Sequence, residues 1–207
     1  MEQVESFAPD AFVGVNTAVE TVELDGAPAL RVVKNTRLDE FDINTYAKVL
    51  GVDFHNGVIE VEVQGRLLSD APDYARAFVG IVFRTDPDEK EFESYYVRPT
   101  NGRRCTDPVR RQHGCQYFSY PGYTFSYFRE FGITAYEAAL DIDVDEWIAL
   151  KAVIEDDRAA FYVNDMEAPA LVVDGMKHGP DARGCVGIYV DTGTDGYARN
   201  FRVTCWD

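Results

Sequence analysis

Short stretches in which apolar and polar residues alternate are the most constraining feature of this sequence. The clearest is Val58–Leu68, in which Ile59, Val61 and Val63 fall on one side of an extended chain and polar residues on the other. Side chains of a β-strand point alternately to the two faces of its sheet. The pattern therefore predicts a strand with one face in the core and one face toward solvent.

Further apolar stretches of strand length, bounded by turn residues, follow along the whole chain. The predicted strands are 22–34 (two strands joined by a turn at 25–26), 47–51, 77–84, 94–99, 115–120, 147–154, 159–164, 170–173, 186–190 and 201–206. No segment has the 3.6-residue period of a helix longer than about two turns. The sequence thus predicts an all-β fold, a two-sheet antiparallel jelly-roll β-sandwich with a long loop rich in arginine and aromatic residues.

The length of 207 residues fits one domain of this kind, spanning 1–207, although residues 1–20 show no clear period and their structure is left open. No apolar run is long enough to span a membrane. The first residues lack the basic and apolar regions of a signal peptide. We therefore expect a cytoplasmic protein as the sequence stands, or a periplasmic or secreted one if a leader was removed.

Charge is distributed unevenly along the chain. The formal net charge is −16, yet residues 94–131 hold six arginines and two acidic residues, so this segment carries +4 and the other 169 residues carry −20. The segment also contains ten of the 27 Phe, Tyr and Trp residues. An acidic chain is repelled by phosphate backbones, which argues against nucleic-acid binding. The segment suits a polar or anionic ligand with flat faces, or its arginines pair with the acidic remainder while its aromatic residues form a local core.

Cysteine and metal chemistry is weakly indicated. Cys105, Cys115, Cys185 and Cys205 have no zinc-site spacing. A Cys105–Cys115 and a Cys185–Cys205 disulfide are one alternative, and four free thiols are the favoured one. No cofactor is expected. A structural calcium ion on the oxygens of 191–196 is an alternative to a simple turn there.

The strands and turns together carry a family resemblance. The successive segments GVIEVEVQGRL, FVGIVFR, YYVRPTNGR, SYPGYTF and GIYVDTGTDGY resemble the concanavalin A-like lectin/glucanase superfamily, and more closely its laminin-G-like or 3-keto-disaccharide-hydrolase-like bacterial jelly rolls. The resemblance covers about residues 21–206. It implies two antiparallel sheets, of which the more curved one offers a concave face to saccharides. Because the superfamily includes lectins, glycosidases, lyases and structural modules, it leaves the activity open.

Glu60 and Glu62 are the first candidate catalytic residues. They lie on one strand face, about 6.6 Å apart at their Cα atoms. Glucanases of the resembling group carry E-x-D-x-x-E or E-x-D-x-E on one strand, and here Gln64 replaces the third acid, so the general acid is missing at that position. The alternative is two solvated acids, or acids paired with Arg84 or Arg98 on neighbouring strands.

The remaining candidates surround the basic segment. His113 is the third candidate for proton transfer, because its ordinary pKa lies near neutrality, although a loop histidine is more often only hydrogen-bonded. Arginine forks suit carboxylates, sulfates and sugar hydroxyls, and tyrosine rings stack on sugars. The predicted ligand-binding residues are Arg84, Tyr96, Arg98, Arg111, Gln116, Tyr117 and Tyr123. Trp147 is expected in the core, and His55 and His178 in structural turns.

Three functions follow from these observations. The first is a carbohydrate-binding jelly-roll domain that holds a saccharide on its concave face. The second is a glycoside-processing hydrolase or lyase that uses Glu60, Glu62 or His113 as acid or base. The third is a non-catalytic module in which residues 94–131 contact a partner protein. A saccharide is the expected partner, with neither nucleic acid nor membrane.

Overall fold

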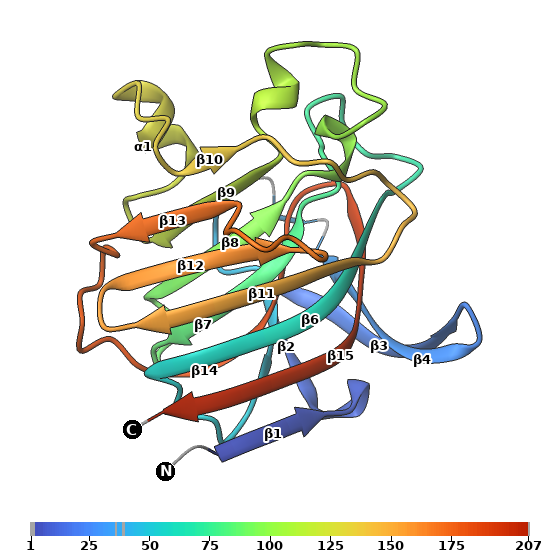
Figure 1. The fold of residues 1–207 in the computed structure, drawn as a ribbon. Coiled ribbons are helices and arrows are strands. Elements are labelled where there is room, and N and C mark those ends of the chain that lie inside the picture. Colours follow the sequence, from blue (N-terminus) through green and yellow to red (C-terminus); the bar gives the residue numbers. More distant parts are fainter. Residues whose placement is uncertain (1–2, 36, 39, 207) are drawn as a thin grey trace.

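Two antiparallel sheets pack face to face in the computed structural model, which describes residues 3–35, 37–38 and 40–206 (Figure 1). Sheet A runs in the order β13 (Leu171–Asp174), β12 (Arg158–Val163), β11 (Ile148–Glu155), β6 (Asn56–Leu67), β15 (Thr194–Trp206), β4 (Ala27–Lys34) and β3 (Thr17–Leu24), with β1 (Gln3–Phe7) also paired to β15. Sheet B runs in the order β10 (Glu137–Ala138), β9 (Cys115–Tyr120), β8 (Phe92–Val97), β7 (Val79–Thr85), β14 (Cys185–Val190), β5 (Tyr46–Val49) and β2 (Phe12–Val15).

Helical structure is confined to short pieces outside the sheets. One α-helix, α1 (Phe125–Glu130), and three 3₁₀ turns, η1 (Pro9–Ala11), η2 (Pro99–Asn101) and η3 (Arg110–Gln112), lie within the described residues. No helix there is long and apolar enough to cross a membrane. The prediction of an all-β, two-sheet antiparallel sandwich is confirmed, and each predicted strand is present.

The structure differs from the sequence prediction at both ends of the chain. Residues in 3–20, whose structure was left open, form β1, η1, β2 and the start of β3. The last strand, β15, begins at Thr194 rather than at 201. Its register shifts between Arg199 and Arg202, and Asn200 has φ 55°. This bulge interrupts the alternation of side chains, so only the second half of the strand is visible as a pattern in the sequence.

The main core lies between the sheets. Ile59, Val61 and Val63 of β6 point into it, as their alternation predicted, and Val79, Ile81 and Phe83 of β7 face them from sheet B. Both sheets therefore contribute one apolar face to a common interior.

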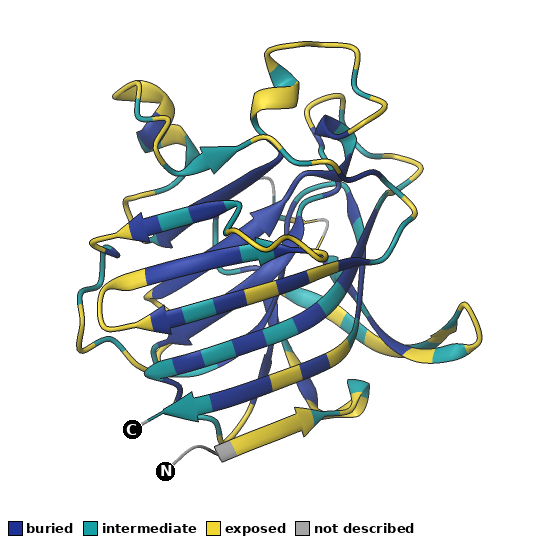
Figure 2. Ribbon diagram, viewed as in Figure 1, coloured by how far each residue is buried: buried dark blue, intermediate teal, exposed yellow. Residues whose placement is uncertain are grey.

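The outer faces of the two sheets are different. Strand β6 alternates between buried and partly exposed residues, whereas β7 and β8 are buried at every position (Figure 2). A second aromatic cluster covers the outer face of sheet B, with Tyr96 5.7 Å from Phe118 and 5.4 Å from Tyr189, ring centroid to centroid. Phe128 of α1 is 1% exposed within this cluster. The basic, aromatic segment thus folds back over the sheet that it leaves.

Candidate functional site

A pocket of about 390 Å³ lies on the outer face of sheet B. More than half of its lining comes from the segment 94–131, and the rest from the loops before β5 and β7 and after β14. Aromatic rings, guanidinium groups and two carboxyls dominate the lining: Phe41, Tyr74, Phe78, Tyr96 and Phe125; Arg76, Arg98, Arg110 and Arg129; Asp42 and Asp191. The pocket also reaches His113 and Asn101.

The floor of the pocket is a fixed network on β8 and β9. Tyr96 lies opposite Gln116 in the strand register and donates its hydroxyl proton to Gln116 Oε1 at 2.8 Å. Arg98 Nη2 donates to the Tyr96 hydroxyl at 3.0 Å and also to Gln116 Oε1. The Arg98 guanidinium lies 5.2 Å from the Tyr96 ring centroid and 5.6 Å from that of Phe125. These contacts hold an arginine and two aromatic rings in one orientation.

Glu137 of β10 supplies the negative charge that this network needs. Its side chain is 4% exposed, and its Oε1 lies 2.6 Å from Arg98 Nη1 and 3.1 Å from Arg129 Nη2. Its Oε2 lies 3.0 Å from His113 Nδ1. Burial lowers the pKa of Arg98, but the neighbouring Tyr96 and Glu137 outweigh it and raise that pKa above its ordinary value. Arg98 is therefore charged, buried and paired.

Asp42 and Asp191 form an acidic corner of the pocket. Asp191 accepts hydrogen bonds from Lys34 Nζ at 2.8 Å and from the Tyr189 hydroxyl at 2.9 Å. It also accepts the backbone N–H of Asp42 at 2.8 Å. Asp42 accepts the N–H of Phe125 at 2.6 Å. Burial, followed by the charge of Asp191, raises the pKa of Asp42 to about 7. This carboxyl therefore changes charge near neutral pH, which is typical of functional sites.

Arg76 and Arg110 line the pocket without an acidic partner. Arg76 Nη1 donates to the carbonyls of Asp73 and Ala75, both at 2.7 Å. Arg110 Nε donates to Asn101 Oδ1 at 3.2 Å. Among residues 3–35, 37–38 and 40–206, neither guanidinium lies within ion-pair distance of a carboxylate. Neutral acceptors thus position both guanidinium groups, and neither forms an ion pair within the described residues.

Four of the predicted site residues come together here: Tyr96, Arg98, His113 and Gln116. Sequence reasoning did not find Asp42, Arg76, Phe78 or Arg110 as site residues. Arg110 was recognised only through the positive charge of its segment. Asp42 and Arg76 come from polar loops with no period, so nothing in their local sequence indicates which face they reach.

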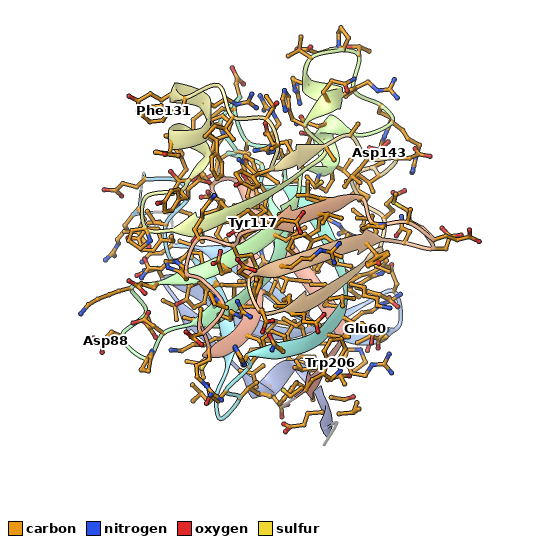
Figure 3. The ribbon with its side chains drawn as sticks, turned by 60° about the vertical axis from the view of Figure 1, so that its left-hand side comes forward. Glu60, Asp88, Tyr117, Phe131, Asp143 and Trp206 are labelled. Atoms are coloured by element: carbon orange, nitrogen blue, oxygen red, sulfur yellow. The ribbon has the colours of Figure 1, made fainter. Side chains whose placement is uncertain are left out.

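Three other predicted ligand-binding residues lie elsewhere. Tyr117 is buried between the sheets, where its hydroxyl donates to Glu93 Oε2 at 2.5 Å (Figure 3). Tyr123 is 38% exposed and packs 5.3 Å from the Tyr127 ring, outside the pocket lining. Arg111 is exposed on η3, also outside that lining. We do not include these three residues in the site.

Arg84 is a buried structural residue at the far end of β7. It adopts φ 52°, and its guanidinium donates to the carbonyls of His55 at 2.8 Å and Asp156 at 2.7 Å. Burial lowers its pKa. Because backbone carbonyls occupy its donors, we leave Arg84 out of the site as well.

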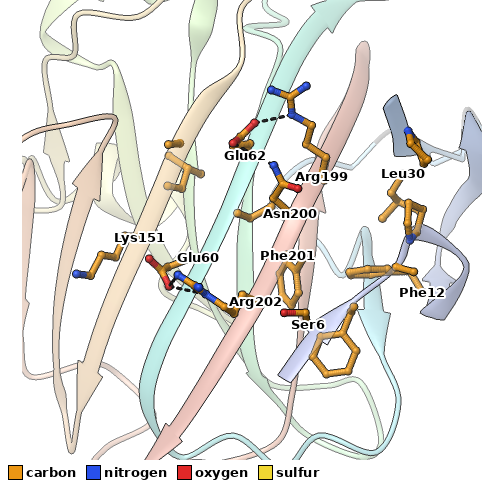
Figure 4. A pocket seen from close by; sticks show the side chains of 18 of the residues that line it. Ser6, Phe12, Leu30, Glu60, Glu62, Lys151, Arg199, Asn200, Phe201 and Arg202 are labelled. Carbon is orange, nitrogen blue, oxygen red and sulfur yellow. Dashed lines mark hydrogen bonds and ion pairs between the residues drawn. The ribbon is translucent and has the colours of Figure 1, made fainter. Parts of the chain in front are cut away.

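Glu60 and Glu62 lie on the opposite side of the molecule, on the outer face of sheet A (Figure 4). Glu62 Oε2 is 2.5 Å from Arg199 Nε, and Glu60 Oε2 is 2.6 Å from Arg202 Nη2. Both acids line a second pocket of about 740 Å³ beside β1 and β15. They are thus paired with arginines of β15, rather than with Arg84 or Arg98.

Trp147 differs from its prediction as a core residue. It is half-buried on sheet A, its Nε1 donates to Asp25 Oδ2 at 2.8 Å, and the Arg199 guanidinium lies 4.1 Å from its ring centroid. His55 and His178, predicted to be structural, each contact a backbone carbonyl from a distant part of the chain, that of Pro180 at 2.6 Å and that of Tyr120 at 2.8 Å.

The cysteines and the 191–196 turn were also candidates for special chemistry. All four cysteines are free thiols, and burial raises the pKa of Cys115 to about 11. Asp191 pairs with Lys34, while Asp195 pairs with Arg31 Nε at 2.6 Å. Across the described ranges, no three His, Cys, Asp or Glu side chains are grouped to hold a metal ion.

Solved structures with the same fold are similar to this chain at low sequence identity. Carbohydrate binding module CBM66 from Bacillus subtilis matches with a TM-score of 0.59 and 14% identity, over 93% of this chain and 94% of that one. A protein of unknown function with a galectin-like fold from Bacillus subtilis gives 0.57 and 12%, over 99% and 100%. Beta-glucanase from Bacillus licheniformis gives 0.52 and 8%, over 98% of each. No protein-family model and no curated protein matches the sequence.

The likeness to these structures establishes the fold. The chain is a jelly-roll sandwich, so the fold that the sequence resemblance implied is confirmed.

Replacing Arg98 by alanine should destabilise the protein. The change leaves the buried carboxylate of Glu137 with fewer partners, and breaking a buried pair from one side costs about 3–5 kcal/mol. Arg111→Ala, an exposed control, should change the free energy of unfolding by less than about 0.5 kcal/mol. Urea unfolding followed by tryptophan fluorescence measures both. Equal midpoints for Arg98→Ala and the unsubstituted protein would contradict this view of the network.

Asp42 should make stability depend on pH. Its carboxyl has a higher pKa folded than unfolded, so the folded state holds the proton more tightly. Its contribution to stability is present below about pH 4 and is lost as pH rises toward 7, by up to about 4 kcal/mol. In urea unfolding at pH 4 to 8, the free energy of unfolding of Asp42→Asn should therefore increase relative to that of the unsubstituted protein as pH rises. Buried Glu93 also has a raised pKa, but both proteins contain it, so its effect cancels in the difference between their stabilities. A difference that stays constant across this range would refute the assignment.

Proposed function

We propose that this jelly-roll domain binds a saccharide in the pocket over sheet B. One observation carries the proposal: aromatic rings and preordered guanidinium groups converge on a single hollow. Its volume of about 390 Å³ lies within the roughly 300–1,000 Å³ typical of small-molecule sites. The fold, shared with a carbohydrate binding module and a glucanase, supports the same class of ligand without identifying one.

The lining supplies the two kinds of contact that a sugar ring uses. Phe78 and Phe125 present apolar ring surface to the C–H face of a sugar. Arg110, Asn101 and Asp42 present donors and acceptors to its hydroxyls. Because Arg98 and Tyr96 are already hydrogen-bonded to each other, ordering them costs little when a ligand arrives.

Binding is favoured over hydrolysis at Glu60 and Glu62. Each carboxylate lies within 2.6 Å of an arginine nitrogen of β15, so both acids are held in ion pairs within the sheet. Gln64, at the position of the third acid, is buried.

A glycoside-processing activity in the sheet B pocket is the second candidate. The pKa of Asp42 lies at about 7, so this carboxyl retains a proton to donate, while the Asp191 carboxylate beside it is paired with Lys34. Glycosidases use two carboxyl groups for acid and base roles, and the environment of each group decides which role it takes. Turnover of a bound glycan that disappears in Asp42→Asn but persists in Glu62→Gln would favour this candidate.

A glycan array with purified protein tests the proposal. The strongest glycan should bind about tenfold more weakly to Phe125→Ala, because the loss of one stacked ring removes about 1.4 kcal/mol. Trp147→Ala, which removes a half-buried aromatic ring from the other sheet, should change the affinity less than twofold.

The remaining outcomes count against the proposal in different ways. Loss of binding in Trp147→Ala alone would place the ligand on sheet A. Absence of binding to any glycan at millimolar concentration would leave the protein-interaction module as the explanation for the basic segment.

A further inference from the structure

We propose that the ligand of the sheet B pocket is an acidic saccharide, whose carboxylate or sulfate group is held between Arg76 and Arg110. The inference rests on the proposed function and names the chemical class of its ligand. It follows from the excess of positive charge around the pocket.

The carboxylates of Glu137 and Asp191 have partners within the protein. Glu137 lies within 3.1 Å of Arg98 and Arg129, and its other oxygen lies 3.0 Å from His113. Asp191 is paired with Lys34 at 2.8 Å. Because Glu137 shares one negative charge between two guanidinium groups, these contacts leave the pocket with excess positive charge, which Asp42, with a pKa of about 7, offsets in part.

Two guanidinium groups of the pocket lining have no carboxylate partner within the described residues. Arg76 and Arg110 are each half-buried, and each donates to neutral oxygens only, the carbonyls of Asp73 and Ala75 for Arg76 and the Asn101 side chain for Arg110. Burial and the nearby charges of Arg110 and Arg98 lower the pKa of Arg76, as expected for like charges brought together. An anion between Arg76 and Arg110 would relieve this repulsion.

The chemistry of the two groups selects the kind of anion. A guanidinium presents a planar fork of donors that matches carboxylate and sulfate oxygens in pairs. The chain as a whole is strongly acidic, with a net charge of −16, so it repels extended polyanions. A sugar that brings one acidic group to the pocket, and stacks its ring on Phe125, meets both conditions.

An array of matched glycans tests the inference. Each oligosaccharide containing glucuronate, galacturonate or mannuronate stands beside its neutral parent and a sulfated form of that parent. The unsubstituted protein should bind at least one acidic member tenfold more tightly than its neutral parent. A preference for the uronate or for the sulfate form identifies which group is held.

Arginine variants separate this claim from general charge attraction. Arg76→Gln combined with Arg110→Gln should reduce the preference for the acidic member to less than twofold. Arg111→Gln removes the same charge from the exposed neighbour of Arg110 and should leave the preference intact. If the double variant does not fold, judged by circular dichroism, each single variant should lower the preference at least threefold.

The outcomes distinguish the two proposals. Equal binding of neutral and acidic members overturns the acidic ligand while the saccharide site survives. A preference that persists in the arginine variants also overturns it. Absence of binding across the whole array overturns both proposals.

Discussion

The pocket depends on the ion pairs that the buried carboxylate of Glu137 forms with Arg98 and Arg129. Burying a charged arginine costs free energy of folding unless an opposite charge lies close to it. Glu137 provides that charge to Arg98 after β8 and to Arg129 on α1, and its other oxygen lies 3.0 Å from His113 after η3. One side chain of a two-residue strand thus joins three otherwise separate parts of the segment 94–138, and so fixes the walls of the pocket relative to its floor.

This anchoring explains the difference between the two sheets. Sheet A keeps one polar face, where Glu60 and Glu62 form ion pairs with arginines of the neighbouring strand. Sheet B is buried on both faces, because α1 and the adjoining loops cover its outer side with a second aromatic cluster. The positive charge around the pocket is therefore partly structural, through Arg98 and Arg129, and partly available to a ligand, through Arg76 and Arg110.

The sequence predicted the strands well because successive side chains of a strand point to opposite faces. A strand with one buried face therefore shows apolar residues at every second position. It also predicted that Tyr96, Arg98 and Gln116 share a surface, since residues two apart on a strand point the same way and Gln116 lies opposite Tyr96. The same rule places Tyr117 on the other face from Gln116, in the core. Arg84 was less predictable, because its left-handed backbone conformation ends the regular alternation of β7.

Other parts of the site had no signal in the sequence. Asp42 and Arg76 lie in loops without alternation, and only the packing of β5, β7 and β14 side by side brings them to Phe125 and Asp191. The raised pKa of Asp42 arises from that packing, because burial and the nearby Asp191 are both tertiary effects. Long-range charge balance was visible in the sequence only as an excess of arginine over one segment.

A crystal structure of the protein with its strongest array glycan tests the central claim most directly. A sugar ring should lie against Phe125 on the outer face of sheet B, with its acidic group between Arg76 and Arg110. A sugar bound instead beside Glu60 and Arg199 on sheet A, with the sheet B pocket unchanged, would contradict it.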